Sequence, residues 1–250
     1  MKIGAQLYTI REFCKNLDDF SESLKKIADI GYTTVQVSGT CDFDPQWLKN
    51  QLDANGLSCV LTHTPGDRMI ADAVKVAQDH SVFGCDHIGL GWFSFDESDP
   101  NKSYNHFVET YRPVARAFRD NGKLFMYHNH AHEFAKQEGK LILQKISEDF
   151  APDELGFTID TYWVQVGGGD PAQWIERFSG RVPCIHLKDC AFEQKMAVIG
   201  EGNINFDRVF EKAESAGTKY MLVEQDDCYG EDPFDCLKRS YNNLKALGFK

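Results

Sequence analysis

The stretch GFTIDTYWVQVGGGDPAQWIERFSGRVPCIHLK, residues 156–188, contains one complete strand–helix–strand unit. Short apolar runs predict strands at Gly156–Asp160 and Pro183–Lys188, and the segment 170–178 between them has a helical pattern. Asp170-Pro171 is typical of a helix start, because an Asp carboxylate accepts hydrogen bonds from first-turn N–H groups and Pro needs no donor there. The stretch therefore predicts two parallel strands joined by a helix.

The same alternation of short apolar runs and longer amphipathic runs extends over the whole chain, which we treat as one domain, residues 1–250. Eight strands, each followed by a helix, predict a closed (β/α)8 barrel, the TIM barrel fold. An open doubly wound sheet is the alternative, but it would usually show a Gly-rich phosphate loop after its first strand, and Tyr8–Phe13 has none. The other predicted strands are Lys2–Leu7, Thr33–Ser38, Leu57–His63, His87–Trp92, Leu124–His128 and Tyr220–Glu224, and the other predicted helices are Leu17–Ile30, 45–54, 68–81, 101–120, 139–149, 205–216 and 234–246.

Composition and charge narrow the class of partner. The chain is 42% hydrophobic, and 38 acidic against 27 basic residues give a formal net charge of −11. Such a field repels phosphate backbones and anionic lipid, so we expect neither nucleic acid nor a membrane as partner. The N-terminal MKIGAQLYTI resembles a strand rather than an export signal, and the eight cysteines form no CxxC pair. We therefore expect reduced thiols and a cytoplasmic protein, with a homo-oligomer left open.

Imidazole and carboxylate side chains stand at the carboxyl ends of several predicted strands. In a TIM barrel these ends build the active site. Charged groups are costly to gather in a partly dry cavity unless a cation compensates them. Mixed carboxylate and imidazole ligands suit one divalent ion, Mn²⁺, Zn²⁺, Co²⁺ or Mg²⁺, and no cysteine ends a strand where it could join. The residues concerned are His63, His128, Asp160, His186 and Glu224.

Five runs in order resemble the xylose isomerase-like barrel superfamily, which includes sugar-phosphate isomerases/epimerases and inosose dehydratases. The resemblance covers essentially the whole chain, and the first of these runs is similar to a YHNHxxEF subgroup. The runs are FMYHNHAHEF (125–134), FTIDTYW (157–163), CIHLKD (184–189), IGEGNINF (199–206) and YMLVEQD (220–226).

This resemblance implies a set of metal ligands. The family holds its metal with a carboxylate after strand five, an Asp after strand six, a His after strand seven and a Glu after strand eight. Asp160, His186 and Glu224 match the last three positions. Strand five ends in His128 where many members have Glu, and Glu133 follows five residues later. We favour Glu133 as the fourth ligand with His128 in the pocket, and the reverse assignment stays open.

Each candidate also has an ordinary structural explanation. Asp160 could be only a helix N-cap, and His186 only a core histidine bonded to backbone. Glu224 ends an apolar strand, where a buried lone carboxylate would be penalised. The remaining candidates are substrate contacts that could equally be satisfied polar groups or rim packing: His63, His130, Lys188, Trp163 and Trp92. Tyr8 and Phe93 could belong to the same apolar wall, and the run Asp226–Asp227 is more typical of solvated surface.

The resemblance implies a metal-dependent isomerase or epimerase of a small keto-sugar that abstracts a proton next to a carbonyl. Glu224 would be the base, with His128 and Glu133 as acid/base partners. A histidine at the end of strand five leaves room for a lyase or dehydratase acting on a 3-oxo-sugar, a 3-oxo-glycoside or an inosose. A non-catalytic sugar-binding barrel and an AP-endonuclease-like hydrolase are further alternatives. The net charge disfavours the hydrolase, which needs a basic surface and three metals.

Overall fold

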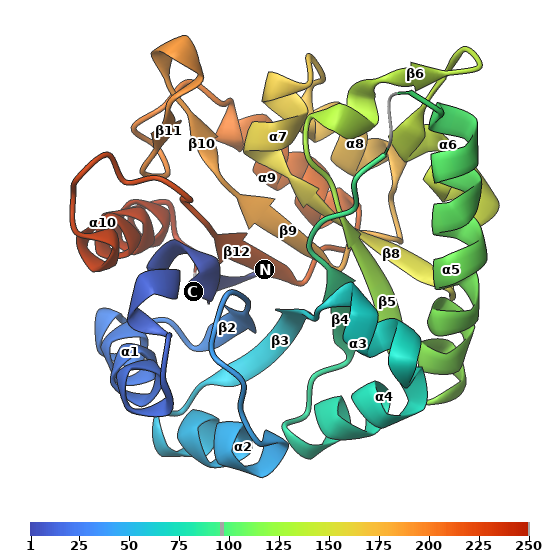
Figure 1. The fold of residues 1–250 in the computed structure, drawn as a ribbon. Coiled ribbons are helices and arrows are strands. Elements are labelled where there is room, and N and C mark those ends of the chain that lie inside the picture. The colour runs from blue at the N-terminus through green and yellow to red at the C-terminus, as the bar shows by residue number, and fades with distance from the viewer. Residues whose placement is uncertain (96–97, 250) are drawn as a thin grey trace.

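The computed structural model describes residues 1–95 and 98–249, and in this part of the chain eight parallel strands close into a barrel (Figure 1). Neighbouring strands follow the order β1-β12-β9-β8-β5-β4-β3-β2. The predicted TIM barrel is confirmed, and each of the eight predicted strands is present. Their bounds are β1 Lys2–Gln6, β2 Thr34–Val37, β3 Ser58–His63, β4 His87–Leu90, β5 Leu124–His128, β8 Leu155–Asp160, β9 Cys184–Leu187 and β12 Tyr220–Val223.

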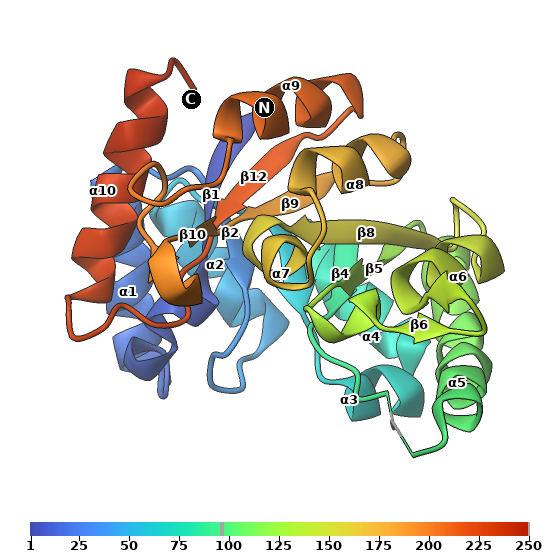
Figure 2. The same ribbon diagram turned by 90° about the horizontal axis from the view of Figure 1, so that it is seen from above.

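Helices surround the strands, and α8 and α9 lie side by side on the outside of the barrel (Figure 2). The segment 68–81, predicted as one helix, contains two, because Asp72 (φ −158°) leaves the helical region and its carboxylate caps the second helix at Lys75 N. The helices are α1 Leu17–Ile30, α2 Pro45–Ala54, α3 Gly66–Ala71, α4 Ala73–Val82, α5 Pro100–Asp120, α6 Ile142–Asp149, α7 Thr161–Val166, α8 Pro171–Arg177, α9 Phe206–Ser215 and α10 Pro233–Ala246.

Short elements fill the loops at the carboxyl ends of the strands. A 3-10 turn at Leu7–Phe13 follows β1, and another at His132–Phe134 follows β5. Two small hairpins pair β6 Lys136–Gln137 with β7 Lys140–Leu141 and β10 Asp189–Cys190 with β11 Met196–Ala197; a third 3-10 turn is Phe192–Gln194. These elements and α7 were not predicted.

Apolar side chains divide between two packed layers. The larger layer lies between strands and helices and includes Phe125, Tyr127 and Ile185. The smaller one fills the barrel interior with Val60, Leu61, Met126, Cys184 and Leu222. Successive residues of a strand face opposite sides of the sheet. A residue two positions after an inward-facing one therefore also points into the barrel.

All eight cysteines are free thiols. Among the described residues, no helix has both the length and the apolar character that a membrane crossing requires.

His80 on α4 provides a pH-dependent contribution to stability. The side chain is 3% exposed, and its ring nitrogens contact Val76 O at 2.7 Å and Thr62 Oγ1 at 2.8 Å. Burial lowers the pKa of His80 to about 4, with the Val76 carbonyl opposing and Arg68 and Lys123 adding to the effect. The folded state therefore resists a proton that the unfolded state accepts.

We predict that His80 makes the protein less stable as pH falls from about 6.5 to 4. Above this window the neutral ring is favoured in both states, and below it both states are charged, so the loss levels off. The full effect is about 3 kcal/mol, because each pKa unit corresponds to about 1.4 kcal/mol. Urea unfolding of wild type and His80→Gln at several pH values should show a shallower slope in the variant. Parallel curves across this window would contradict the prediction.

Candidate metal centre

The barrel interior carries four polar side chains directly above its apolar layer. Met126, Cys184 and Leu222 point inward, so the side chains two residues later point inward as well. These are His128 on β5, His186 on β9 and Glu224 after β12, and Asp160 joins them from the end of β8. The strands that carry them are consecutive neighbours in the barrel.

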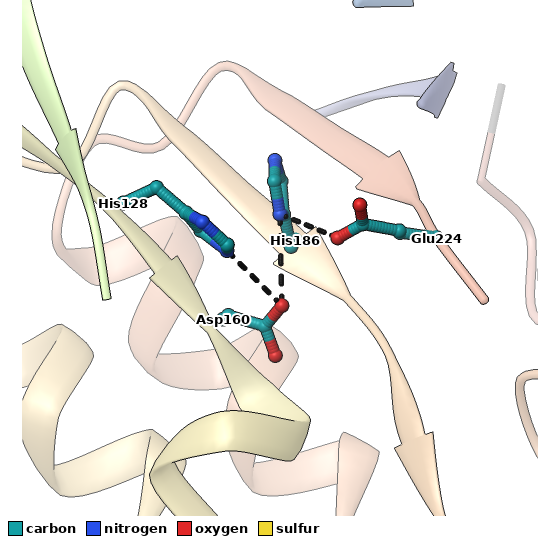
Figure 3. Close-up of side chains that lie close together, drawn as sticks. All are labelled: His128, Asp160, His186 and Glu224. Carbon is teal, nitrogen blue, oxygen red and sulfur yellow. Dashed lines mark hydrogen bonds and ion pairs between the residues drawn. The ribbon is translucent and has the colours of Figure 1, made fainter. Parts of the chain in front are cut away.

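The four side chains converge (Figure 3). His128 Nε2 lies 3.3 Å from Asp160 Oδ2, and His186 Nδ1 lies 2.8 Å from Glu224 Oε2 and 3.6 Å from Asp160 Oδ2. One ligand atom from each residue lies within 4.8 Å of the other three. All four side chains are buried. This arrangement brings together Asp160, His186 and Glu224, as the sequence predicted, from three separate parts of the chain.

The position of Asp160 is compatible with both of the roles that the sequence left open. Its Oδ1 accepts a hydrogen bond of 2.9 Å from Trp163 N and caps α7. Its Oδ2 faces His128 and His186. Although burial opposes ionisation, Lys188 and the two imidazoles hold the pKa of Asp160 below its usual range. The carboxylate is therefore ionised, with one oxygen available to a cation.

His186 shows that the residues fit a metal ion. Its Nε2 contacts Gln36 Oε1 at 2.7 Å, which fixes Nε2 as a donor and turns Nδ1 toward the two carboxylates. Nδ1 is buried and makes no aligned hydrogen bond despite its short distance to Glu224. Burial opposes a charge on this ring, yet Glu224 and Asp160 raise the pKa of His186 to about 9, so this place favours positive charge. A divalent cation would take the place of the Nδ1 proton and satisfy the imidazole and both carboxylates together.

Gln36 was not predicted. Gln36 is fully buried on β2. A glutamine inside the otherwise apolar run TVQV could have indicated a residue of the site. We predict that Gln36→Leu weakens Mn²⁺ binding about 10- to 100-fold, the usual cost of losing the partner that orients a ligating histidine. Calorimetric titration with Mn²⁺ measures this, with Gln173→Leu on the outer helix α8 as control. An affinity within twofold of wild type would show that Gln36 does not orient the ligand.

Lys188 lies beside the centre and is almost fully buried. Its Nζ lies 2.7 Å from Asp226 Oδ2, 3.3 Å from Glu224 Oε2 and 3.6 Å from Asp160 Oδ2. Burial opposes the ammonium charge, but Glu224, Asp160 and Asp226 raise the pKa of Lys188 above its usual value. The prediction of a solvated Asp226–Asp227 run is wrong for Asp226, whose side chain is 24% exposed and paired with Lys188, whereas Asp227 is exposed.

The structure does not bring Glu133 into the four-residue group. Its Oε1 accepts a hydrogen bond of 2.7 Å from Tyr127 Oη and lies 3.1 Å from His132 Nε2. Its Oε2 accepts one of 2.8 Å from His130 N. These contacts hold Glu133 in a separate group with His130 and His132. The expectation that Glu133 is the fourth member does not match this geometry, and His128 occupies the place instead.

A cavity of about 770 Å³ opens above the centre, and both His128 and Glu224 line it. Its wall includes each predicted substrate contact: His63, His130, Lys188, Trp163 and Trp92. Among the described residues that line this cavity, the buried polar atoms without a hydrogen-bond partner are His63 Nε2, His130 Nδ1, Trp163 Nε1 and Asp226 Oδ1. The cavity therefore offers several unsatisfied donors and acceptors to a polar ligand.

The aromatic residues of the rim separate into two roles. Trp92 is 57% exposed and lies against the rings of His130 and His132, with centroids 4.6 and 4.5 Å away. Tyr8 also lines the cavity. Phe93 instead packs against Phe95, Phe107 and Tyr111 beside α5, so it is ordinary core packing.

Asp189 fixes the loop that follows β9. Its buried carboxylate accepts hydrogen bonds from four backbone N–H groups. Gly202 is needed here, because an added Cβ would lie 2.4 Å from Asp189 Oδ1, and Gly200 (φ +88°) makes the turn. The IGEGN motif is thus a tight turn bound to Asp189, and Glu201 contacts Arg239 at the surface.

Comparison with known proteins agrees with this fold. A solved sugar phosphate isomerase/epimerase from Parabacteroides distasonis has a TM-score of 0.84 at 24% identity, over 99% of this chain and 94% of that one. A structure of L-ribulose 3-epimerase has a TM-score of 0.75 at 14% identity, over 98% and 94%. A probable 3-DHS dehydratase from Bacillus anthracis has a TM-score of 0.72 at 14% identity, over 98% and 99%.

No curated protein matches the chain. The family model described as the xylose isomerase-like TIM barrel matches residues 24–245. The match spans most of the barrel and includes all four residues of the centre. The chain therefore belongs to the xylose isomerase-like TIM barrel family.

Proposed function

We propose that this protein is a divalent-metal-dependent isomerase or epimerase that acts on a small keto-sugar. The observation that carries the proposal is the buried group His128, Asp160, His186 and Glu224 at the base of a 770 Å³ cavity. These four residues would hold the ion, with His128 in place of Glu133. An ion bound there would act as a Lewis acid on the carbonyl of a bound sugar.

The chain's own residues supply the remaining chemistry. Glu224 is buried, and despite burial its pKa is held well below its usual value by Lys188 and His186, so it is a carboxylate that can accept a proton from the carbon next to the carbonyl. Lys188 lies 3.3 Å from Glu224 Oε2 and can stabilise developing negative charge on the substrate. Trp163 and Trp92 provide apolar faces for the C–H side of a sugar.

His128 supports a lyase or dehydratase as the second candidate. The family's usual group at this position is a carboxylate that can serve as a second base, whereas the His128 imidazole faces the centre through Nε2 and would hold the ion. A single base on one face of the sugar suits removal of an α-proton with departure of a leaving group from a 3-oxo-sugar, a 3-oxo-glycoside or an inosose. The fold is shared with solved structures named as epimerase and as probable dehydratase, so both chemistries occur on this scaffold.

Proton exchange with solvent tests the proposal. Protein loaded with Mg²⁺ should transfer deuterium from D₂O to the α-carbon of a keto-sugar or 3-oxo-glycoside, observed by NMR. A non-catalytic sugar-binding barrel would bind the sugar without exchange. Because the net charge is −11, we also expect that the protein does not bind DNA at low salt. The proposed substrate is a small molecule of the cytoplasm.

A further inference from the structure

A second cavity of about 510 Å³ adjoins the first at the same end of the barrel. Segments 37–45 after β2 and 62–68 after β3 form its walls, together with α4. The two cavities share the border residues Ser38, Gly39, His63, Thr64 and Pro65. The two cavities therefore meet along the residues that follow β2 and β3.

The walls of the second cavity combine apolar faces with a polar rim. Phe43 and Phe83 are apolar walls, and Thr40 and Thr64 contribute hydroxyl groups. Its volume falls within the range of about 300–1,000 Å³ typical of sites for whole small molecules, and it is much larger than a single phosphate group needs.

The charged residues on the walls of the two cavities indicate whether the ligand is neutral or phosphorylated. The charged residues that line the second cavity, among those the structure describes, are Arg68, Asp42 and Asp79, one positive charge against two negative. Arg68 already donates to Asp79 Oδ2 at 2.8 Å. In the first cavity the cation Lys188 is likewise paired with Glu224 and Asp226. Neither wall therefore presents an unpaired cation to a phosphate.

His63 connects the two cavities. It lies on their common border, with Nδ1 3.2 Å from Ser38 Oγ and a buried Nε2 that has no hydrogen-bond partner. Gly91 makes room for this ring, because an added Cβ there would lie 2.8 Å from His63 Nδ1. His63 is thus a residue of the common border that has one ring nitrogen without a hydrogen-bond partner.

We propose that the substrate is an uncharged sugar with a second glycosyl unit, in which the second unit occupies the 510 Å³ cavity and His63 Nε2 hydrogen-bonds the linking oxygen. This inference rests on the proposed function, since it places the reacting keto unit above the metal centre. It makes the substrate a keto-disaccharide rather than a sugar phosphate.

The test compares ligands that share one ketose. D-fructose, D-fructose 6-phosphate, turanose, lactulose and isomaltulose are titrated calorimetrically into protein loaded with Mg²⁺; the last three carry a glycosyl unit at different positions of fructose. At least one keto-disaccharide should bind about tenfold or more tightly than fructose, because the second unit buries additional surface. Thr40→Trp and the more exposed Asp42→Trp should remove this advantage and leave fructose affinity unchanged.

Thr110→Trp on the outer helix α5 is the matched control and should retain the advantage. Disaccharides that bind no more tightly than fructose, or not at all, overturn the inference. The inference is also overturned if fructose 6-phosphate binds most tightly and Arg68→Gln abolishes the preference for it. That result would make the second cavity a phosphate site. If fructose exchanges its α-proton for deuterium but no disaccharide binds more tightly, the proposed function stands and this inference fails. If a disaccharide binds more tightly but no sugar exchanges a proton, only the proposed function is refuted.

Discussion

Glu224→Gln should lower the rate of deuterium exchange at the sugar α-carbon about 10²- to 10⁴-fold, the usual contribution of a positioned general base. The amide keeps the size of the side chain and one oxygen toward the centre, but it cannot accept the substrate proton. The carboxylate is 3% exposed and is held in place by its contacts with His186 and Lys188. The rate is measured by NMR in D₂O at saturating Mg²⁺.

The exchange rate is measured at saturating metal so that weaker metal binding by the variant does not lower it. Any remaining loss of rate then reports the loss of the base. Mn²⁺ affinity of Glu224→Gln is measured in parallel, and exchange is compared only where the site is filled. Glu201→Gln is the control, since Glu201 lies in the IGEGN turn and its side chain pairs with Arg239 at the surface. Exchange in Glu224→Gln within about threefold of wild type would remove Glu224 from the role of base.

Asp160→Asn should raise the Mn²⁺ dissociation constant at least about 100-fold, more than the loss of a partner that only orients a ligand. The substitution is selective because Asn Oδ1 can still accept the hydrogen bond from Trp163 N that caps α7. What it removes is the negative charge of Oδ2, the oxygen that faces His128 and His186. Isothermal titration with Mn²⁺ measures the change, and circular dichroism checks that the variant folds.

Asp170→Asn is the matched control for this variant. Asp170 caps α8 through Ala172 N as Asp160 caps α7, but its other oxygen pairs with the surface residue Arg208. Asp170→Asn should bind Mn²⁺ with wild-type affinity. If Asp160→Asn and Asp170→Asn behaved alike, Asp160 would be a cap without a metal role.

The fold was largely predictable because buried parallel strands are apolar on consecutive residues. Runs such as Leu124–His128 and Tyr220–Glu224 stand out between amphipathic helices, and the helix Leu17–Ile30 was predicted with its observed bounds. The break at Asp72 was not predicted, since the amphipathic pattern continues across it. The short helix α7 was missed because Thr161–Val166 has only 6 residues, too few to show a helical period.

The site was predictable where the chemistry depends on strand ends, and less so where it depends on loop geometry. Asp160, His186 and Glu224 stand at the ends of predicted strands, and the family resemblance implied that they lie together. The choice between His128 and Glu133 could not be predicted, because the loop after β5 could place either side chain near the barrel axis. Tyr127 and the N–H of His130 decide it by binding the Glu133 carboxylate. These contacts arise only when the loop folds back on its own strand.

Two further residues depend on packing across the barrel. Gln36 contacts His186, which is 150 positions away along the chain, and Asp226 pairs with Lys188, 38 positions away. A glutamine within an apolar strand was a signal for the first. An acidic pair after a strand is ordinary at a surface, so nothing in the sequence marked Asp226.

The location of the metal ion tests the account most directly. Crystals of the wild-type protein grown with Mn²⁺ should show one anomalous peak at about 2.0–2.3 Å from His128, His186 Nδ1, Asp160 and Glu224. A peak between His130, His132 and Glu133, which form the other candidate group, or no peak at saturating Mn²⁺, would contradict the claim that these four side chains hold the ion.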